Sequence, residues 1–486
     1  MTILAVLGMN LRVDDNPALF HAAEQASTSG ESVVALVCQD TNVRAPGAAF
    51  TWWTSQSLAL FRSELESLGI PMLAVSAPVD ELIPRLVKEL QLSAVHANRR
   101  WGESALDVDR RWAETLKEQG ITVRGHTAHT LHDPWAVSTG QGGPYRVFTP
   151  FSKRFMESEE AFNGQPVGVP EPVTSQTSLF KTVSGLELGT PLESSTEPHW
   201  AAKFTWQPGE VAAVERMEDF LSGPVEDYAS ARDLPDRPGT SGLSPYLAHG
   251  EISARRAWEM AQQHALGAPS ESAETFKTEL LWREFNYHLL YHYPDLHERN
   301  LNSRFDAFPW KSPEKEPVAD QVALWRSGHT GHPIVDAGMR QLWETGWMHN
   351  RVRMVVASLL TKNLGVHWSL GEQWFWDTLV DADPASNPGN WQWASGTGAD
   401  AAPYFRIFNP RRQAERFDDD ATYVRRWVPE LAEVETSSIM KLYEADSALP
   451  AHADLRPAQT VELYPAPIVD LKTSRADALD AYQSIK

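Results

Sequence analysis

Cysteine is nearly absent from this chain of 486 residues, because Cys38 is the only one. A single cysteine excludes intramolecular disulfides and cysteine-rich metal sites, and it fits a reducing compartment. No apolar run reaches the roughly 18 residues that a membrane-spanning helix needs. The first ten residues also lack the basic region and the cleavage-type site of a signal peptide. We therefore expect a cytoplasmic protein without a metal centre and without membrane contact.

Basic residues are scarce too, since 43 Lys and Arg stand against 64 Asp and Glu and give a formal net charge of −21. This balance argues against nucleic-acid binding by the whole surface, because phosphates attract Lys and Arg. Two stretches depart from the average. Residues 350–363 carry basic side chains and no acid, and residues 403–416 carry four arginines and one glutamate. Charge alone leaves two interpretations open for them, solvated helix faces or a local basic groove.

Apolar, strand-like runs alternate with helical patterns through the first third of the chain. The runs cover residues 3–8, 32–38, 71–77, 93–98 and 121–126, and the helical patterns cover 16–28, 52–68, 79–91 and 103–119. Continuous apolar strands separated by helices predict a parallel, doubly wound sheet with helices on both faces. We assign this α/β domain to residues 1–130.

The character of the sequence changes twice more. Pro, Ser, Thr and Gly dominate residues 131–205, which predicts a long interdomain connector. Helical spacing prevails afterwards, so we expect an all-α domain over residues 206–477 and a short C-terminal end over 478–486. Tryptophan is the outlier of the composition, with 19 residues, most of them in this second half. Such a concentration indicates stacking on flat ligands or bases, with ordinary core packing as the alternative.

Residues 381–410 combine carboxylates, Asn387 and two tryptophans on a stretch interrupted by Pro and Gly. The interruptions predict irregular backbone rather than one long helix. Tryptophans argue against a purely solvated loop. Arg353 stands beside the apolar stripe of the helical pattern at 350–363, where a guanidinium needs a carboxylate. We expect Asp381 to supply it.

Two shorter motifs are chemically suggestive. The segment "ELLWREF" places Glu279, Trp282 and Arg283 on one helical face, where they suit a nucleobase held by its edge and by its ring. The alternative is a surface salt bridge beside a half-buried Trp. The segment "GTSGLSPYLAHGEIS" (239–253) places small hydroxyls and glycines before a helix that has Pro245 near its start. This pattern suits either a phosphate site or an ordinary helix cap.

Five stretches, in order, resemble the photolyase/cryptochrome family: residues 142–155, 239–253, 279–285, 328–362 and 381–410. The resemblance covers nearly the whole chain and is nearest to class I-type cyclobutane pyrimidine dimer photolyases. It implies a light-driven DNA repair enzyme, a carbon–carbon lyase that splits the dimer by electron transfer from excited reduced FAD. The alternatives are a cryptochrome-like blue-light photoreceptor and a related DNA-binding protein without repair activity.

The resemblance also implies which residues hold FAD. Asn387 matches the residue that faces flavin N5, and Arg353 is again the expected partner of Asp381. The residues implied for FAD binding are Tyr228, Thr240, Ser241, Gly242, Leu243, Ser244, Phe276, Arg283, Asn350, Arg353, Asp381, Asp383 and Asn387. Trp391, Trp368 and Trp310 match an electron-transfer chain from flavin to surface, and with Glu279 and Asn387 they form the implied catalytic set.

UV-damaged DNA is the implied partner, bound by a monomer. Trp282 and Trp393 would flank a flipped dimer, and Glu279 would hydrogen-bond its pyrimidine edge. The residues implied for DNA and dimer binding are Arg232, Glu279, Trp282, Asn350, Arg351, Met354, Trp393 and Gln413. Family members that act on (6-4) photoproducts carry a His-His pair where this chain has His349 and Asn350. Plant-type cryptochromes carry Asp at the position of Asn387.

The antenna chromophore stays open between methenyltetrahydrofolate and 8-hydroxy-deazaflavin. Glu103 aligns with a folate-contacting acid, and residues 44–53 lie near the deazaflavin site of other members. The family usually begins with a Trp-Phe-Arg-Arg-Asp-Leu-Arg-like motif. Residues 7–12 of this chain keep only Leu11 and Arg12 of it, so the motif does not establish that an antenna is bound.

Overall fold

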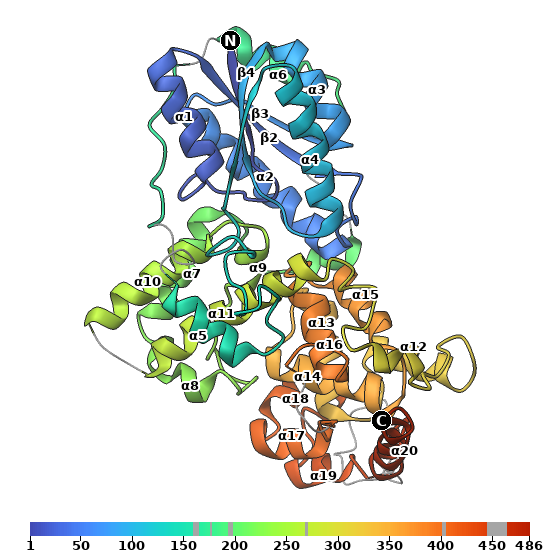
Figure 1. The fold of residues 1–486 in the computed structure, drawn as a ribbon. Coiled ribbons are helices and arrows are strands. Elements are labelled where there is room, and N and C mark those ends of the chain that lie inside the picture. Colours follow the sequence, from blue (N-terminus) through green and yellow to red (C-terminus); the bar gives the residue numbers. More distant parts are fainter. Residues whose placement is uncertain (159–164, 175–176, 193–197, 268–270, 401–404, 445–463) are drawn as a thin grey trace.

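The computed structural model describes residues 1–158, 165–174, 177–192, 198–267, 271–400, 405–444 and 464–486. It shows an α/β domain, blue in Figure 1, above a helical domain coloured green to red. The strands are β1 (Thr2–Val6), β2 (Ser32–Asp40), β3 (Met72–Ala77), β4 (Leu92–Asn98), β5 (Thr122–His126) and β6 (Thr190–Pro191). They lie in the order β5-β4-β1-β2-β3-β6, and all neighbours are parallel except β3 and β6. The predicted parallel sheet is confirmed, with one short antiparallel edge strand added.

Both faces of this sheet are covered, as continuous apolar strands require. Helices α1 (Pro17–Ser29) and α2 (Ala48–Ser67) pack on one face, against residues such as Ile3 and Val33. Helices α3 (Val79–Leu90) and α4 (Glu103–Glu118) pack on the other, against the alternating neighbours Leu4 and Val34. Side chains of a strand point alternately to its two faces, so each strand contributes to both cores. The sheet is therefore doubly wound.

The stretch between the domains contains short elements that pack on both. They are α5 (Phe148–Glu157), α6 (Thr177–Ser184), β6 and the 3-10 helix η1 (His199–Lys203). Phe151 and Phe155 of α5 are buried in the core of the helical domain. Val183 of α6 joins the core of the sheet. The described parts of this connector thus fasten one domain to the other.

The second half is helical, as predicted. Its elements are α7 (Glu210–Leu221), η2 (Pro224–Asp227), α8 (Tyr228–Ala231), α9 (Ser244–Ala248), α10 (Ala254–Gly267), α11 (Glu271–His292), η3 (Ser303–Ala307), α12 (Val318–Ser327), α13 (Pro333–Thr345), α14 (Asn350–Ser358), the π-helical turn η4 (Leu359–Asn363), α15 (Trp368–Thr378), α16 (Ser386–Ser395), α17 (Pro410–Phe417), α18 (Thr422–Trp427), η5 (Pro429–Leu431), α19 (Thr436–Lys441) and α20 (Leu471–Gln483). They enclose two large apolar clusters. In the described part of the chain, no helix is both long enough and apolar enough to cross a bilayer.

Arg12 fixes the two domains against each other. Its side chain is fully buried, and its guanidinium donates to the carbonyl oxygens of Gly250 and Ala128, each at 2.8 Å. The neighbouring Asp15 pairs with Arg255 of the helical domain at 3.0 Å. Buried charge held by several hydrogen bonds is costly to separate. The residue kept from the family's opening motif therefore serves the domain interface.

Candidate functional site

A cavity of about 470 Å³ opens in the helical domain between α8, α11, α14 and α16. Its volume lies in the range of about 300–1,000 Å³ that is usual for small-molecule sites. The residues expected for FAD that line it are Tyr228, Ser241, Leu243, Ser244, Phe276, Arg283, Asn350, Arg353, Asp381, Asp383 and Asn387. The lining does not include Thr240 and Gly242, which flank Ser241 in the sequence.

Arg353 and Asp381 form the pair that the sequence predicted. Arg353 Nη2 donates to Asp381 Oδ2 at 2.8 Å, and Nε donates to the carbonyl oxygen of Met348 at 2.7 Å. The second carboxylate oxygen, Asp381 Oδ1, is buried and has no hydrogen-bond partner among the described residues. A buried oxygen of this kind needs a donor. Its position in the cavity wall therefore suits a ligand that carries an N–H or O–H group.

Asp383 organises the start of α16. Its Oδ1 accepts from the backbone N–H groups of Ala385 (2.9 Å) and Ser386 (2.6 Å), and Tyr287 donates its hydroxyl to Oδ2 at 2.6 Å. Burial alone would raise the pKa of Asp383, but His129, Arg283 and Tyr287 together hold this pKa well below its usual value. The carboxylate stays ionised and accepts hydrogen bonds only. It thereby fixes the backbone that carries Asn387.

The segment before α9 forms a tight backbone turn. Gly242 has φ +65°, and a Cβ there would lie 2.7 Å from Arg216 Nη2. The N-cap of α9 is Leu243, which supplies no side-chain cap. The ordinary capping interpretation of this segment is therefore not supported. Ser244 Oγ instead accepts from Trp347 Nε1 at 3.1 Å, at the edge of the cavity.

Asn387 is held by a residue that the sequence did not single out. Its Nδ2 donates to Glu372 Oε1 at 2.8 Å and to the carbonyl oxygen of the same residue at 3.1 Å. Glu372 in turn accepts a bidentate ion pair from Arg44 of the other domain. The sequence could have indicated Glu372 by its spacing, because it follows Trp368 by four residues and therefore lies on the same, buried face of α15.

Trp282 forms one wall of the cavity. Phe148 of α5 stacks on it, with ring centroids 3.7 Å apart and planes inclined by 7°. Trp393 of α16 is half-buried and lines the same cavity, together with Met354 and Asn350. Phe148 was not predicted, although it lies in the matching stretch 142–155. The residues expected for the dimer and those expected for FAD thus share one cavity.

The arginines expected to contact DNA are each paired with a carboxylate. Arg232 donates to Glu279, and Arg351 Nη2 lies 2.6 Å from Asp233 Oδ2. Asp233 was not predicted, although it follows Arg232 directly. Both pairs line the cavity, whereas Gln413 of α17 lies outside the lining. A phosphate bound by either arginine would therefore have to compete with these carboxylates.

Arg283 takes a different direction from Glu279 and Trp282. It lines the cavity, but its Nη1 donates to the carbonyl oxygen of His129 at 2.7 Å. The expected trio on one helical face is therefore divided. Glu279 and Trp282 lie among the residues expected for the dimer, whereas Arg283 lies near His129 and Asp383.

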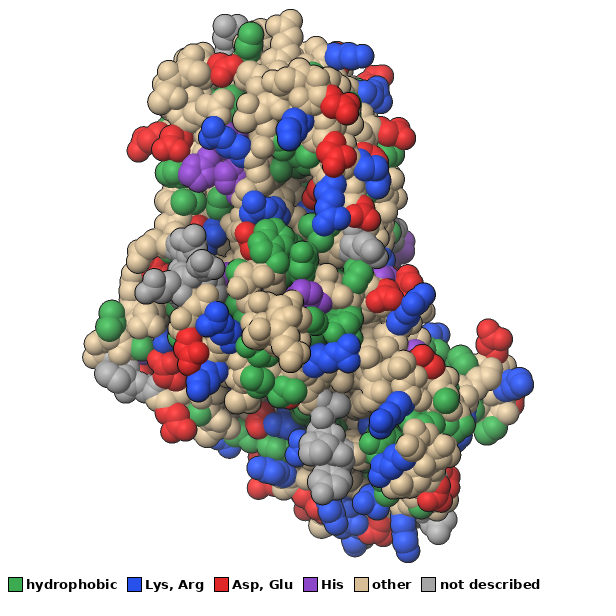
Figure 2. Space-filling model, viewed as in Figure 1, with side chains coloured by type: hydrophobic (Ala, Val, Ile, Leu, Met, Phe, Trp, Pro, Cys, Tyr) green, Lys and Arg blue, Asp and Glu red, His purple; other side chains and the backbone are tan. Residues whose placement is uncertain are grey.

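A local basic surface exists despite the acidic whole. Figure 2 shows Lys and Arg side chains toward the lower end of the helical domain, mixed with acidic ones. Helix α17 contributes Arg411, Arg412 and Arg416 to this part of the molecule. Arg411 pairs with Glu415 at 2.9 Å, while Arg412 is exposed. Pairing of Arg411 and exposure of Arg412 leave both interpretations of the 403–416 charges, solvated helix face and local basic groove, open.

Aromatic rings lead from the cavity toward the surface. Trp391 is buried, lines the cavity and packs so closely on Gly371 that a Cβ there would lie 2.1 Å from its ring. Trp368 lies on α15, three residues before Gly371, and is fully buried. The ring of His367 lies 5.3 Å from Trp368 and 5.1 Å from Trp310, which is half-buried. Trp391 thus lies at the cavity, and His367 connects the rings of Trp368 and Trp310. An electron-transfer chain through the three tryptophans stays a prediction.

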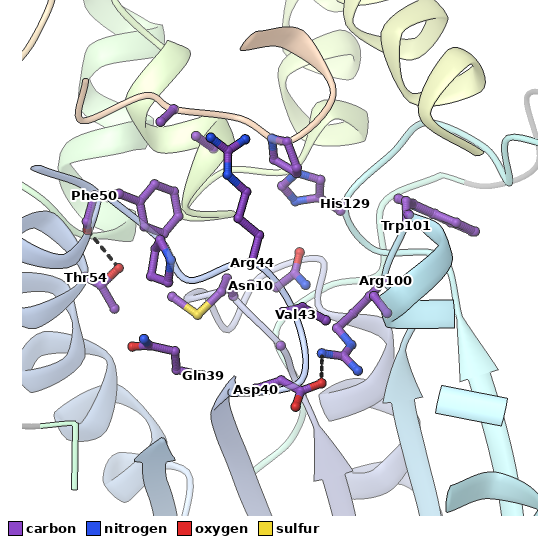
Figure 3. A pocket seen from close by; sticks show the side chains of 18 of the residues that line it. Asn10, Gln39, Asp40, Val43, Arg44, Phe50, Thr54, Arg100, Trp101 and His129 are labelled. Atoms are coloured by element: carbon purple, nitrogen blue, oxygen red, sulfur yellow. Dashed lines mark hydrogen bonds and ion pairs between the residues drawn. The ribbon is translucent and has the colours of Figure 1, made fainter. Parts of the chain in front are cut away.

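A second cavity, of about 300 Å³, lies between the domains. Figure 3 shows Asn10, Asp40, Arg44, Phe50 and Arg100 around it. Arg100 Nη1 donates to Asp40 Oδ2 at 2.9 Å. Cys38 also lines this cavity, and burial raises its thiol pKa to about 11. The predicted stretch 44–53 contributes to the wall, whereas the side chain of Glu103 lies outside the described residues.

Known proteins resemble this chain over its whole length. A family model described as "FAD binding domain of DNA photolyase" matches residues 276–484, and one described as "DNA photolyase" matches residues 7–172. A deoxyribodipyrimidine photo-lyase of Agrobacterium fabrum is 42% identical, over 98% of this chain and 96% of that protein. Cryptochrome-2 of Arabidopsis thaliana is 32% identical, over 96% of this chain and 76% of that protein.

Solved structures of photolyases also resemble this chain. A bacterial class III photolyase from Agrobacterium tumefaciens superposes with a TM-score of 0.84 at 40% identity, covering 100% of this chain and 97% of that one. An archaeal photolyase from Sulfolobus tokodaii with two FAD molecules superposes with a TM-score of 0.77 at 26% identity, covering 100% of both chains. One of these similar structures is a class III photolyase, and the nearer resemblance to class I-type members stays a prediction.

Proposed function

We propose that this chain, which belongs to the photolyase/cryptochrome family, is a light-driven DNA repair enzyme that splits cyclobutane pyrimidine dimers with bound FAD. One observation carries the proposal: most of the residues expected for the flavin and most of those expected for the dimer line a single cavity. Electron transfer requires donor and acceptor to lie close together. A shared cavity meets that requirement without any movement of the domains.

The residues of the cavity fit FAD. Asp381 Oδ1 offers an unpaired acceptor, and Asn387 offers an amide fixed by Glu372. The turn before α9 offers backbone close to Ser241 and Ser244, as a phosphate-bearing ligand requires. When bound, reduced FAD supplies the light absorption and the electron for ring opening. The chain itself orients the reactants and excludes water from them.

The dimer would lie between Trp282 and Trp393. Phe148 covers the outer face of Trp282, so the indole is a fixed wall rather than a mobile side chain. Arg232 pairs with Glu279 and positions its side chain, whose oxygens can accept from the edge of a pyrimidine. Met354 offers an adaptable thioether surface. Flipping a damaged base costs less than flipping an intact one, which adds selectivity.

We further propose that the chain acts as a monomer, in the cytoplasm, on UV-damaged DNA. The single, buried cysteine supports a reducing compartment. An antenna chromophore is expected in the interdomain cavity, where Phe50 and Trp376 offer rings and Arg44 offers charge. A photoreceptor role is the second candidate, because a cryptochrome among the relatives also matches this chain over nearly its whole length.

Replacing Trp282 with Ala should weaken the binding of dimer-containing DNA by about 1–3 kcal/mol, the usual contribution of one base-stacking ring. Binding of undamaged DNA should change little, because the wall contacts only a flipped base. Fluorescence titration of matched oligonucleotides with and without one dimer measures both affinities. The control is Trp343→Ala, which removes a Trp that is 45% exposed and lies outside the cavity lining. Equal losses on both DNAs would refute the assignment of this wall.

A further inference from the structure

Arg44 reaches from the α/β domain to a carboxylate behind the flavin cavity. It lies between β2 and α2, and its Nη1 and Nη2 donate to Glu372 Oε1 and Oε2 at 2.8 and 2.9 Å. The Glu372 side chain is 0% exposed, and that of Arg44 is 29% exposed. Bidentate pairs of this kind are strong and fix orientation. The buried carboxylate thus receives a cation from the other domain.

The segment that carries Arg44 is itself held in place. Arg44 Cζ lies 4.1 Å above the ring of Trp376, and Trp376 Nε1 donates to the carbonyl oxygen of Ala45 at 2.9 Å. The backbone N–H of Ala48 donates to Asp377 Oδ1 at 3.0 Å. We call these contacts the interdomain clasp. Figure 3 shows Arg44 extending from its loop toward the helical domain.

Glu372 determines how the amide of Asn387 is oriented. Both acceptors of Asn387 Nδ2 belong to Glu372, its Oε1 and its carbonyl oxygen. A carboxylate only accepts hydrogen bonds, so it selects the nitrogen end of the amide. The amide oxygen of Asn387 then points away from Glu372 and is free to accept a hydrogen bond. Because Asn387 lines the flavin cavity, that oxygen is offered to the ligand.

We propose that Arg44 is a positioning residue for the flavin, acting through Glu372 on the Asn387 amide. Without the guanidinium, Glu372 would be a buried carboxylate lacking its cation, which is costly and favours a change of its rotamer. A Glu372 side chain in another rotamer would no longer accept from Asn387 Nδ2 through Oε1, and the amide would be free to turn over. The inference rests on the proposed function, because it requires FAD in this cavity.

The test compares variants of the full-length protein with bound FAD. Arg44→Met keeps an unbranched aliphatic side chain but removes the guanidinium, and with it both the donors to Glu372 and the group that lies over Trp376. We expect bound reduced FAD to be reoxidised in air about tenfold faster, the factor that a perturbed hydrogen bond to a charged group commonly carries. The midpoint potential of bound FAD should shift accordingly. Arg44→Lys, which keeps the charge but not the fork, should restore part of the effect.

Two controls separate positioning from domain docking. Asp377→Ala removes a different contact of the interdomain clasp and should leave reoxidation and potential unchanged. In a Glu372→Gln background, where the neutral amide needs no cation and still accepts from Asn387, Arg44→Met should have no further effect. Unchanged reoxidation in FAD-loaded Arg44→Met, or an equal effect of Asp377→Ala, would overturn the proposal. A wild-type protein unable to bind FAD would instead refute the proposed function.

Discussion

Photoreduction of bound FAD by an external reductant should be largely lost when Trp391 is replaced with Phe. Trp391 lines the flavin cavity and is buried beside Gly371 and Phe375, so it is the first easily oxidised ring on the way to the surface. Phe fills most of the same space but is far harder to oxidise. Dimer repair by chemically reduced enzyme should remain nearly intact, because the electron for repair does not pass through this ring.

The measurement is the loss of oxidised-flavin absorbance under blue light with a thiol reductant present. Trp112→Phe is the matched control, because Trp112 is equally buried but belongs to the α/β domain. Its photoreduction should equal that of the wild type. A normal rate in Trp391→Phe would mean that another of the 19 tryptophans carries the electron. Loss of repair by the pre-reduced variant would mean that Trp391 also shapes the dimer site.

Asp383→Ala should lower the free energy of unfolding of the helical domain by about 2–4 kcal/mol, because two backbone N–H groups lose their charged acceptor and a buried hydroxyl is left unpaired. The carboxylate accepts from Ala385, Ser386 and Tyr287 in a buried site. Asp383→Asn should cost less, because its amide oxygen can still accept from the two backbone groups. Thermal unfolding followed by circular dichroism ranks the variants by stability. Asp477→Ala, at an exposed position, is the control.

The difference in stability between the wild type and Asp383→Ala should depend on pH. The folded protein holds the pKa of Asp383 well below its unfolded value. Its contribution to stability is therefore fully present above the unfolded pKa of about 3.9 and is lost as the pH falls below it. The stability difference between wild type and Asp383→Ala should stay constant from neutral pH to about pH 5 and then shrink. A difference that widens on acidification would contradict the assignment of Asp383 as a buried carboxylate.

The order of elements could be predicted because it depends on local pattern. Each predicted strand and helix of the first third appears, since apolar runs and helical spacing are properties of neighbouring residues. The pair between Arg353 and Asp381 was also predictable, because an arginine beside an apolar stripe needs a nearby carboxylate. Helix α16 within residues 381–410 was less evident, since Pro388 and Gly389 lie inside it.

Contacts between distant segments could not be predicted. Arg44 and Glu372 are 328 positions apart, and nothing local marks either as the partner of the other. Phe148 lies on the connector and stacks on Trp282 of α11 only because α5 folds back onto the helical domain. The neutralisation of Arg351 by Asp233 likewise depends on tertiary packing. Charge patterns gave the basic residues correctly but not which of them are already paired.

Repair of a defined lesion in light and in darkness tests the central claim most directly. The FAD-loaded, reduced protein would be mixed with an oligonucleotide that carries one cyclobutane dimer, and a second sample would carry one (6-4) product. We expect loss of the cyclobutane dimer under blue light, none in darkness, and no reaction of the (6-4) product, since Asn350 follows His349 where a second His would be needed. An FAD-loaded protein that leaves the cyclobutane dimer intact in light would contradict the repair function and favour a photoreceptor.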